Sequence, residues 1–466
     1  MPSEKSFLAG IAVLMFTVPV AVAQSAAQPA GVPLAAPDPQ IVAGLQEVSP
    51  ERIQQTIEKL VSFYTRQTLS SVMPAASGKG ANAASEWIKS EFEQYSKSCG
   101  GCLEVKTDEF IQEAAPRVPK PTKITNVYAI LKGSDPANAN RIVLVTGHYD
   151  SRNSDTNDAT AQAPGANDDG SGTAVSMECA RVLSKHKFPA TIIFLTVAGE
   201  EQGLNGSAHF AKMAKAQGWN LEAVLNNDIV GGNRTPGDTG QDLHTVRVFS
   251  EGLPVAATEK DVKLIRALGG ENDSSSRQLA RYIAATSAQY LPRDSFHPLL
   301  VFRRDRYLRG GDHTSFNEQG FAAVRFTEYR EDYNHQHQNV RTENGIEYGD
   351  LPKFVDYNYV ANVARLNAAV LASLASAPAP PANVRLLTKE LQNDSTLVWD
   401  ASPGGLATGY EVLRRDTAAP DWEHAQAVGN VTKATMPISK DNVIFAVRAV
   451  GAKGHWSLAV VPAPER

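Results

Sequence analysis

The feature that most constrains this chain is a set of short apolar runs, each followed closely by carboxylate or imidazole side chains. A strand buried on both faces reads as a continuous apolar run, and such strands belong to mostly parallel sheets covered by helices. Ligands of these sheets bind at the carboxyl ends of the strands. We therefore expect an α/β fold, in which a mixed, mostly parallel central sheet is flanked by helices and carries a ligand site at one edge. The first run, residues 142–145, is followed by His148 and Asp150, and the second, residues 194–198, by Glu200 and Glu201. The third is a short run that ends at Leu225 and is followed by Asp228.

The adjacent carboxylates Glu200 and Glu201 indicate a bound cation. Two neighbouring acids repel one another unless a positive charge lies between them or one of them is protonated. Side chains alternate along a strand, so His148 and Asp150 face the same way, and a carboxylate beside an imidazole is the usual support of a metal-bound histidine. Taken alone, each motif is also compatible with a solvated loop.

Further donors occur later in the chain. A turn-rich segment at residues 165–172 contains Asp168 and Asp169, and it precedes a helical pattern at residues 174–183. Asp169 could simply cap that helix. A late segment supplies the imidazoles of His335 and His337. Several strand-end donors in one alternating β/α chain, together with a late histidine, predict a metal site.

These motifs resemble, in the same order, those of the co-catalytic zinc peptidases that include secreted bacterial leucine aminopeptidases and glutamate carboxypeptidase. The resemblance runs from about residue 126 to about residue 367. The family's His-x-Asp, Asp-Asp-Gly-Ser-Gly, Glu-Glu-x-Gly-Leu, Asn-x-Asp and Asp-His-x-x-Phe motifs correspond to residues 147–151, 165–172, 200–207, 226–228 and 312–316.

The resemblance implies two zinc ions per chain, about 3.5 Å apart as in two-metal sites generally. The implied ligands are Asp168, which bridges both ions, His148 and Asp228 on one ion, and Glu201 and a late histidine on the other. Glu200 would be the general base that takes a proton from the water between the ions, and Asp150 would support a liganding histidine. The resemblance also implies a cis peptide bond between Asp168 and Asp169.

The late ligand is expected to be His337. In the family this histidine lies in a His-x-x-x-Asp/Glu-Thr motif, and Thr342 has the matching distance from His337, although Arg341 replaces the acid. His335 lacks a threonine at that distance, so we expect it to support a ligand or to face the substrate.

The oxyanion donor is left open by the sequence. Gln336 occupies the place of a tyrosine that stabilises the oxyanion in several family members, and His313 or Tyr329 could replace it. Four arginines precede Asp312, at positions 303, 304, 306 and 309. They could meet a substrate carboxylate, although surface salt bridges are the commoner fate of such charges.

The N-terminus predicts export. Lys5, an apolar run over residues 7–22 and the small residues Ala21 and Ala23 describe a cleaved signal peptide over residues 1–23. The run is short for a membrane helix and contains Pro19. We therefore expect a periplasmic or extracellular protein that does not span a membrane after cleavage. The net charge of −5 argues against nucleic acid as a partner.

The cysteines and helical patterns give further expectations. Cys99 and Cys102 could form a disulfide, with metal binding as the alternative, and Cys179 reads as a buried small hydrophobe. Helices are expected at residues 50–62, capped by Ser49, at 81–95 and at 274–291. The insertion 233–311, poorly patterned before its helix, is expected to wall the substrate cleft.

The C-terminal part changes in character. An Ala/Pro-rich pattern begins at residue 373, and its last part, residues 376–382, is the expected linker. This linker separates a peptidase domain over residues 24–375 from residues 383–466. Strands are expected at residues 397–399, 410–415, 443–450 and 457–461, with Trp399 and Tyr410 in the core. This segment resembles a fibronectin type III β-sandwich. Its partner could be substrate, a wall surface or the peptidase domain, and we expect it to be dispensable for chemistry.

The combined interpretation is an exported di-zinc exopeptidase, an aminopeptidase first of all, that acts on peptides or proteins. A carboxypeptidase or dipeptidase of the same clan would share every metal ligand. A glutaminyl cyclase-like enzyme would use a related scaffold with one zinc ion. A non-catalytic receptor ectodomain is the fourth alternative, and the full set of acidic motifs argues against it.

Overall fold

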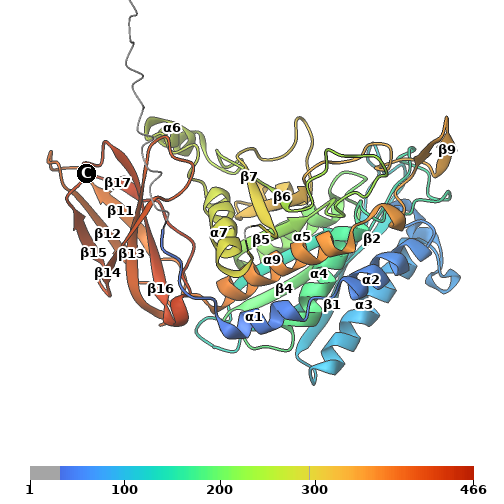
Figure 1. Ribbon diagram of the computed structural model, residues 1–466, viewed down its shortest axis with the longest axis horizontal. Coiled ribbons are helices and arrows are strands. Elements are labelled where there is room, and N and C mark those ends of the chain that lie inside the picture. Colours follow the sequence, from blue (N-terminus) through green and yellow to red (C-terminus); the bar gives the residue numbers. More distant parts are fainter. Residues whose placement is uncertain (1–31, 293) are drawn as a thin grey trace, which may run out of the picture.

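An eight-stranded mixed sheet forms the centre of the computed structural model, which describes residues 32–292 and 294–466 (Figure 1). The strand order is β1-β2-β4-β3-β5-β8-β6-β7, and β4, β3, β5 and β8 run parallel. The outer strands include antiparallel pairs, so the expected mixed, mostly parallel sheet is confirmed. The expected signal peptide lies outside the described residues. The strands are β1 (Leu103–Gln112), β2 (Thr122–Leu131), β3 (Arg141–His148), β4 (Thr191–Val197), β5 (Asn220–Asn227), β6 (Thr245–Ser250), β7 (His297–Val301) and β8 (Ala323–Glu328).

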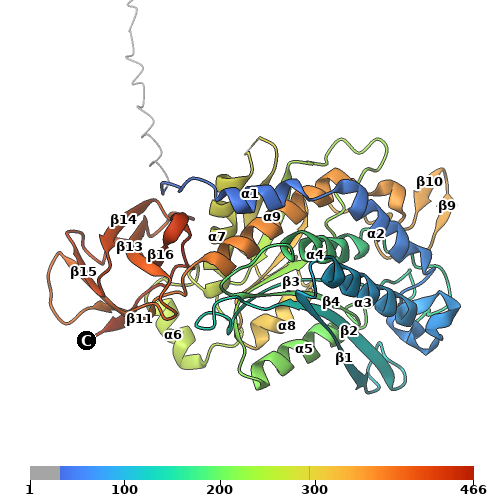
Figure 2. The same ribbon diagram turned by 90° about the horizontal axis from the view of Figure 1, so that it is seen from below.

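Helices cover both faces of this sheet. One apolar core joins the sheet to α2, α3, α4, α7 and α9, and a second core joins its other face to α5 and α8. Figure 2 shows these two layers on opposite sides of the strands. The helices are α1 (Pro39–Gln46), α2 (Pro50–Ser62), α3 (Gly80–Ser98), α4 (Gly170–Leu183), α5 (Asn205–Ala216), α6 (Glu259–Ala267), α7 (Ser275–Tyr290), α8 (His313–Glu318) and α9 (Tyr357–Ser376).

The helices expected from the sequence form where local signals place them. Helix α2 spans the expected residues, because Pro50 suits the first helical position and Ser49 Oγ accepts a hydrogen bond from the amide of Arg52. Its residues Ile53 and Ile57 lie one turn apart and are buried. Helix α4 begins earlier than its apolar pattern, because Asp169 caps it by accepting from the amide of Gly172 at 2.9 Å.

The insertion 233–311 adds two strands to the central sheet, which the sequence did not indicate. It contributes β6 and β7 to the edge of the central sheet, and α7 to the helical layer that packs on α9. These strands are short and five of their eleven residues are polar or proline, so they carry a weak periodic signal. The sheet is therefore wider than the apolar runs in the sequence predicted.

The C-terminal part contains two small sheets with one shared core. Their strand orders are β15-β12-β11-β17 and β14-β13-β16, and Trp399 packs on Tyr410 with ring centroids 5.5 Å apart. The expected strand at residues 457–461 is wrong, because that segment makes only isolated bridges to β16. A further hairpin, β9 (Arg341–Glu343) with β10 (Ile346–Tyr348), precedes α9. The C-terminal strands are β11 (Ala382–Leu387), β12 (Ser395–Asp400), β13 (Ala407–Asp416), β14 (His424–Gly429), β15 (Lys433–Met436), β16 (Val443–Gly451) and β17 (Ala463–Glu465).

The two parts of the chain share an extensive interface. Helix α9 continues to Ser376, so only residues 377–381 connect it to β11. Trp456 belongs to the main apolar core and packs on Tyr282 of α7. Arg415 Nη2 contacts both carboxylate oxygens of Asp273 at 2.9 Å, and both side chains are almost fully buried. The C-terminal sheets thus have a core of their own and also contact the peptidase part, and their dispensability for chemistry stays a prediction.

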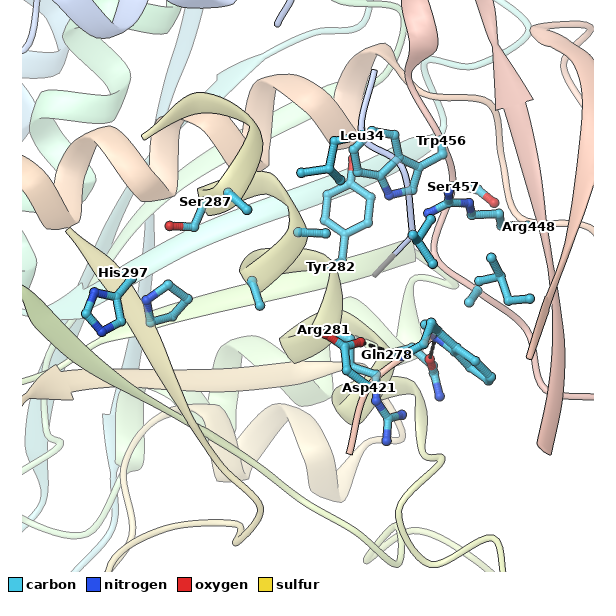
Figure 3. Close-up of a pocket in the computed structure, with 18 of the residues that line it drawn as sticks. Leu34, Gln278, Arg281, Tyr282, Ser287, His297, Asp421, Arg448, Trp456 and Ser457 are labelled. Carbon is cyan, nitrogen blue, oxygen red and sulfur yellow. Dashed lines mark hydrogen bonds between the residues drawn. The ribbon is translucent and has the colours of Figure 1, made fainter. Parts of the chain in front are cut away.

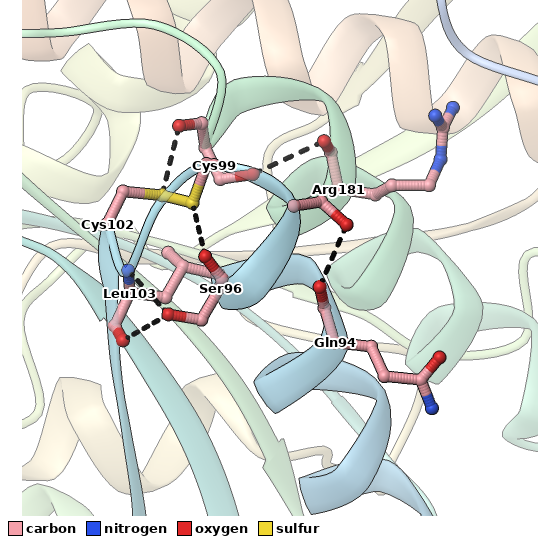
Figure 4. Close-up of a disulfide and its surroundings, with 8 residues drawn as sticks. Gln94, Ser96, Cys99, Cys102, Leu103 and Arg181 are labelled. Atoms are coloured by element: carbon pink, nitrogen blue, oxygen red, sulfur yellow. Dashed lines mark hydrogen bonds between the residues drawn. A yellow bond between two sulfur atoms is a disulfide. The ribbon is translucent and has the colours of Figure 1, made fainter.

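The cysteines have two different environments. Cys99 and Cys102 form a disulfide at the end of α3, where Ser96 Oγ also donates a hydrogen bond to the carbonyl oxygen of Leu103 (Figure 4). Cys179 is a buried free thiol in α4, as expected. In the part of the chain that the structure describes, no helix combines the length and apolar character needed to cross a membrane.

Arg66 ties together the loop that leads from β3 toward α4. Its side chain is fully buried, and it donates hydrogen bonds to the carbonyl oxygens of Tyr149, Pro164 and Gly165 at 2.6, 2.6 and 2.8 Å. A guanidinium presents its donors in a rigid planar fork, which suits three acceptors spread along one loop. No sequence motif marked this residue.

We expect Arg66→Met to lower the free energy of unfolding by about 3–5 kcal/mol, because three buried carbonyl groups lose a charged donor. Urea unfolding followed by fluorescence measures this change. The matched control is Arg52→Met on the exposed side of α2, which should change stability by less than about 0.5 kcal/mol. Equal effects of the two substitutions would contradict this role of Arg66.

Candidate metal centre

The candidate ligands meet at the carboxyl ends of neighbouring parallel strands. His148 is the last residue of β3, Glu200 and Glu201 follow the end of β4, and Asp228 follows β5 directly. Since β4, β3 and β5 are adjacent and parallel, their ends lie at one edge of the sheet. His337 comes from the long connection after β8, at a left-handed backbone position with φ 57°.

The carboxylate of Asp168 lies between two histidines, one on each of its oxygens. Its Oδ1 is 3.2 Å from His148 Nε2, and its Oδ2 is 2.9 Å from His337 Nε2. On the first side Asp228 Oδ1 is 3.9 Å from His148 Nε2, and on the second Glu201 Oε1 is 3.0 Å from His337 Nε2. One carboxylate is therefore shared by two groups of ligand atoms.

These groups fit metal ions. The ligand atoms of His148, Glu200 and Asp228 lie within 4.8 Å of one another, as do those of Asp168, Glu201 and His337. His148 Nε2 and Glu201 Oε1 are buried, face other candidate ligands, and lack a partner with hydrogen-bond geometry among the described residues. Imidazole and carboxylate donors grouped in this way are the ligand types that zinc binds. The donor set thus fits two ions flanking Asp168.

The negative charges of the cluster also favour bound cations. Burial raises the pKa of Glu200 well above its usual value, and the neighbouring Asp228 and Glu201 raise it further. Burial alone would lower the pKa of His148, but Asp150, Asp168 and Asp228 raise it well above its usual value. The four carboxylates of the two groups outnumber their two imidazoles, so positive charge stabilises the ionised cluster.

Asp150 lies behind the cluster rather than in it. Its Oδ1 is 3.4 Å from His148 Nδ1, the ring nitrogen opposite the one that faces Asp168. Its Oδ2 accepts a hydrogen bond from Thr68 Oγ1 at 2.8 Å and one from the amide of Glu201 at 3.3 Å. Asp150 therefore orients the His148 ring and the start of the loop after β4, as the sequence predicted.

The backbone around Asp168 is held by two further carboxylates. Asp350 accepts hydrogen bonds from the amides of Asn167 and Asp168 at 2.8 and 2.7 Å. Asp169 accepts from the amide of His148 at 2.9 Å, which couples the start of α4 to the end of β3. The Asp168–Asp169 peptide bond is cis, as the resemblance implies.

Two glycines allow α4 to approach the sheet. A Cβ atom on Gly172 would lie 2.1 Å from the carbonyl oxygen of Asn227, and one on Gly147 would lie 2.4 Å from the backbone of Gly172. No other residue fits at these positions without moving the backbone. The close approach places Asp168 over the ends of β3 and β5.

The other residues singled out in the sequence lie outside the two ligand groups. His335 is buried and stacks on Phe354 with ring centroids 3.7 Å apart. His313 is fully buried and its Nε2 is hydrogen bonded to the carbonyl oxygen of Arg304 at 2.8 Å. Gln336 Nε2 donates to Asp168 Oδ2 at 3.0 Å, so its amide supports the shared carboxylate.

Arg325 on β8 is a site residue that the sequence did not reveal. It is fully buried, and its Nη2 lies 2.8 Å from Asp228 Oδ1 while its Nη1 lies 3.3 Å from Asp305 Oδ2. The signal available was an arginine between the apolar residues 323–324 and 326 of β8. Its contact with Asp228 fixes the direction of that carboxylate.

The arginine cluster before Asp312 is engaged within the protein. Arg306 and Arg309 contact Glu331 at 2.6 and 3.2 Å, and Arg304 contacts Glu318 at 3.3 Å. Arg303 donates to the hydroxyl of Tyr307. The salt-bridged interpretation of this cluster therefore describes the structure, and these guanidinium groups already have partners.

A model of peptidase family M28 matches residues 126–357, the part of the chain that carries the cluster. A protein of Pyrenophora teres f. teres, described as a probable zinc metalloprotease, is 47% identical over 431 residues, covering 92% of this chain and 88% of its own. A protein of Pyricularia oryzae with the same description is 48% identical over 436 residues, covering 92% of this chain and 85% of its own.

A protein of known structure has a similar fold. The crystal structure of the Legionella pneumophila LapA aminopeptidase matches with a TM-score of 0.50 and 23% identity, covering 72% of this chain and 75% of that one. At this identity the likeness concerns the fold alone. The similarity to the two fungal proteins extends over nearly the whole chain, and the family motifs coincide with the ligand cluster. The chain therefore belongs to peptidase family M28.

Proposed function

We propose that this chain is an exported, zinc-dependent aminopeptidase that removes residues from the N-terminus of peptides or proteins. The observation that carries the proposal is the Asp168 carboxylate, whose two oxygens face two separate groups of ligand atoms. The description of the fungal relatives as probable zinc metalloproteases supports zinc and peptide hydrolysis. The Cys99–Cys102 disulfide and the signal-like N-terminus support an oxidising compartment outside the cytoplasm.

The proposed chemistry assigns a separate task to each of the paired carboxylates. Zinc ions bound by the two groups would supply Lewis-acid polarisation of the scissile carbonyl group. Glu201 contacts His337 and belongs to the second ligand group. Glu200 lies beside His148 and Asp228 in the first group, but it is the partly exposed member of the pair, so it can reach a water molecule and a substrate. It takes the proton of the attacking water and passes it to the nitrogen of the departing amine.

The charges around the site favour an amino terminus over a carboxyl terminus as the substrate group. A carboxypeptidase needs a cation that is available for the substrate carboxylate. Arg306, Arg309 and Arg325 are all paired with carboxylates of the protein. Two Zn²⁺ ions would balance the four carboxylates of the ligand groups, and none of these three arginines is left to bind a substrate carboxylate, which is the feature that favours an aminopeptidase.

Matched peptides test this proposal. We expect the zinc-loaded full chain to shorten a free pentapeptide stepwise from its N-terminus, and mass spectrometry follows the products. N-acetylation of the peptide should abolish cleavage, whereas amidation of its C-terminus should leave the rate unchanged. Release of residues from the C-terminus, or cleavage of the acetylated peptide only, would contradict the proposal.

The two adjacent acids should respond differently to the same substitution. We expect Glu200→Gln to keep both zinc ions and to lower turnover by about 10²–10⁴-fold, because the general base is lost. Glu201→Gln should lose about one zinc equivalent, because a charged ligand becomes a weak neutral one. Metal analysis and initial rates of both variants measure this difference, and zinc loss in the Glu200 variant alone would reverse the assignment.

The two late histidines provide a second matched pair. We expect His337→Ala to lose about one zinc equivalent per chain, because its Nε2 faces Asp168 and Glu201. His335→Ala removes a ring that stacks on Phe354 and should keep both ions. Metal content after gel filtration separates these outcomes. Full zinc content in the His337 variant would show that another residue completes the site.

A further inference from the structure

Arg325 is a permanent cation in direct contact with one of the candidate ligands. It lies on β8, which pairs with β5, and its side chain is fully buried. Its Nη2 is 2.8 Å from Asp228 Oδ1 and 3.4 Å from the backbone carbonyl oxygen of Asp228. A guanidinium is not deprotonated in proteins. One carboxylate oxygen of Asp228 therefore always faces a positive charge.

The Asp228 carboxylate is closely surrounded and keeps its direction. A Cβ atom on Gly311 would lie 3.1 Å from Asp228 Oδ2 and 2.9 Å from Arg325 Nη1, so the backbone at Gly311 passes close to both groups. Arg325 Nη1 also donates a hydrogen bond to the carbonyl oxygen of Gly310 at 2.9 Å. The carboxylate is thus held between a guanidinium and a backbone segment, with Oδ1 turned towards Arg325.

The second group of ligand atoms has no such cation. Among the described residues, the carboxylates of Asp168 and Glu201 form ion pairs with histidines alone. The Gln336 amide, which donates to Asp168 Oδ2 at 3.0 Å, is neutral. Both groups face Asp168, so Arg325 is the permanent charge in direct contact with one group and not with the other.

Asp150 acts on the first group in the opposite direction. A carboxylate behind a liganding imidazole raises its basicity and strengthens metal binding. Asp150 Oδ1 is 3.4 Å from His148 Nδ1, and Asp150 Oδ2 also accepts from Thr68 Oγ1 and from the amide of Glu201 at 2.8 and 3.3 Å. Arg325 is closer, and it contacts a ligand oxygen itself. We therefore expect the effect of Arg325 to outweigh that of Asp150.

The expected effect of Arg325 is a lower affinity for a cation beside Asp228. A metal ion there would share the Asp228 carboxylate with the guanidinium, and two positive charges at short range repel one another strongly in a buried site. Asp305 Oδ2, which is 3.3 Å from Arg325 Nη1, balances part of the guanidinium charge. The strength of the repulsion thus depends on both Arg325 and Asp305.

We propose that Arg325 makes the site of His148 and Asp228 the weaker of the two zinc sites, so that zinc fills the site of Glu201 and His337 first. Arg325 is a positioning residue in this proposal, because it acts through Asp228. The ion beside Asp228 is then the one that exchanges more readily. The proposal rests on the two-zinc site of the proposed function, and its readout is zinc affinity instead of peptide hydrolysis.

Zinc titration of the metal-free full chain tests the order of filling. In competition with a chromophoric chelator, we expect two zinc equivalents whose dissociation constants differ at least about tenfold, since groups behind a ligand change metal affinity by about 10–100-fold. Crystals grown with one zinc equivalent should show one anomalous peak, next to Glu201 and His337. A peak next to Asp228 instead would overturn the proposal.

Two substitutions should move the weaker affinity in opposite directions. Arg325→Met removes the cation and should tighten zinc binding at the weaker site by about 10–100-fold. Asp305→Asn removes the acid that balances Arg325 and should weaken binding at the same site by about tenfold. Damage to the fold would weaken the site in both variants. Opposite shifts therefore separate the electrostatic role of Arg325 from a merely structural one.

The matched control is Arg281→Met on α7. Arg281 is also buried, and its Nη1 is 3.3 Å from Asp273 Oδ1, the distance that separates Arg325 from Asp305. Figure 3 shows Arg281 beside Asp421 of the C-terminal part, and it does not belong to either ligand group. This variant should keep both zinc affinities. Circular dichroism and thermal melting establish that each variant is folded before affinities are compared.

The possible failures are distinguishable. Two zinc equivalents of equal affinity, or shifts in the same direction for Arg325→Met and Asp305→Asn, would overturn this proposal and leave the proposed aminopeptidase untouched. Binding of fewer than two zinc ions by the unaltered chain would contradict the proposed function as well. If Arg325→Met does not fold, the anomalous peak at one zinc equivalent and the Asp305→Asn titration decide the question.

Discussion

The candidate site depends on how one carboxylate is held between two imidazoles. Asp168 can present Oδ1 to His148 and Oδ2 to His337 only while its backbone stays over the ends of β3 and β5. Asp350 holds that backbone through two amides, Asp169 couples it to β3, and Gly172 lets α4 come close enough. These supports come from segments far apart in the sequence, so the site exists only in the complete fold. A rigid support of this kind is what a two-metal site requires, because ligand direction decides metal geometry.

Much of this arrangement could be predicted from the sequence. Continuous apolar runs followed by acids identified β3, β4 and β5, since strands buried on both faces have that pattern. The order of the family motifs predicted the side chains that the structure brings together around Asp168, and the threonine spacing favoured His337 over His335. Ser49 and Asp169 marked helix starts, because short polar side chains accept backbone hydrogen bonds there. All of these signals are local or depend on motif order.

What escaped prediction acts across long sequence distances. Arg66 and Arg325 look like ordinary charged residues until folding brings their partners to them. Strands β6 and β7 are too short and too polar to show a clear period, and the segment 457–461 has the pattern of a strand but makes only isolated bridges. The Ala/Pro linker predicted a C-terminal domain with a core of its own, and it gave no sign that Trp456 and Arg415 also contact the peptidase part. The composition of a linker indicates how stiff it is, and it does not indicate which surfaces of the two joined parts pack together.

We propose that two metal ions share Asp168, one bound with His148 and Asp228 and one with Glu201 and His337. Anomalous scattering at the zinc absorption edge, measured on crystals of the zinc-loaded full chain, would locate these ions. We expect two peaks of similar height on either side of the Asp168 carboxylate, each next to its own histidine. A single peak, or two peaks of which neither contacts Asp168, would contradict this proposal.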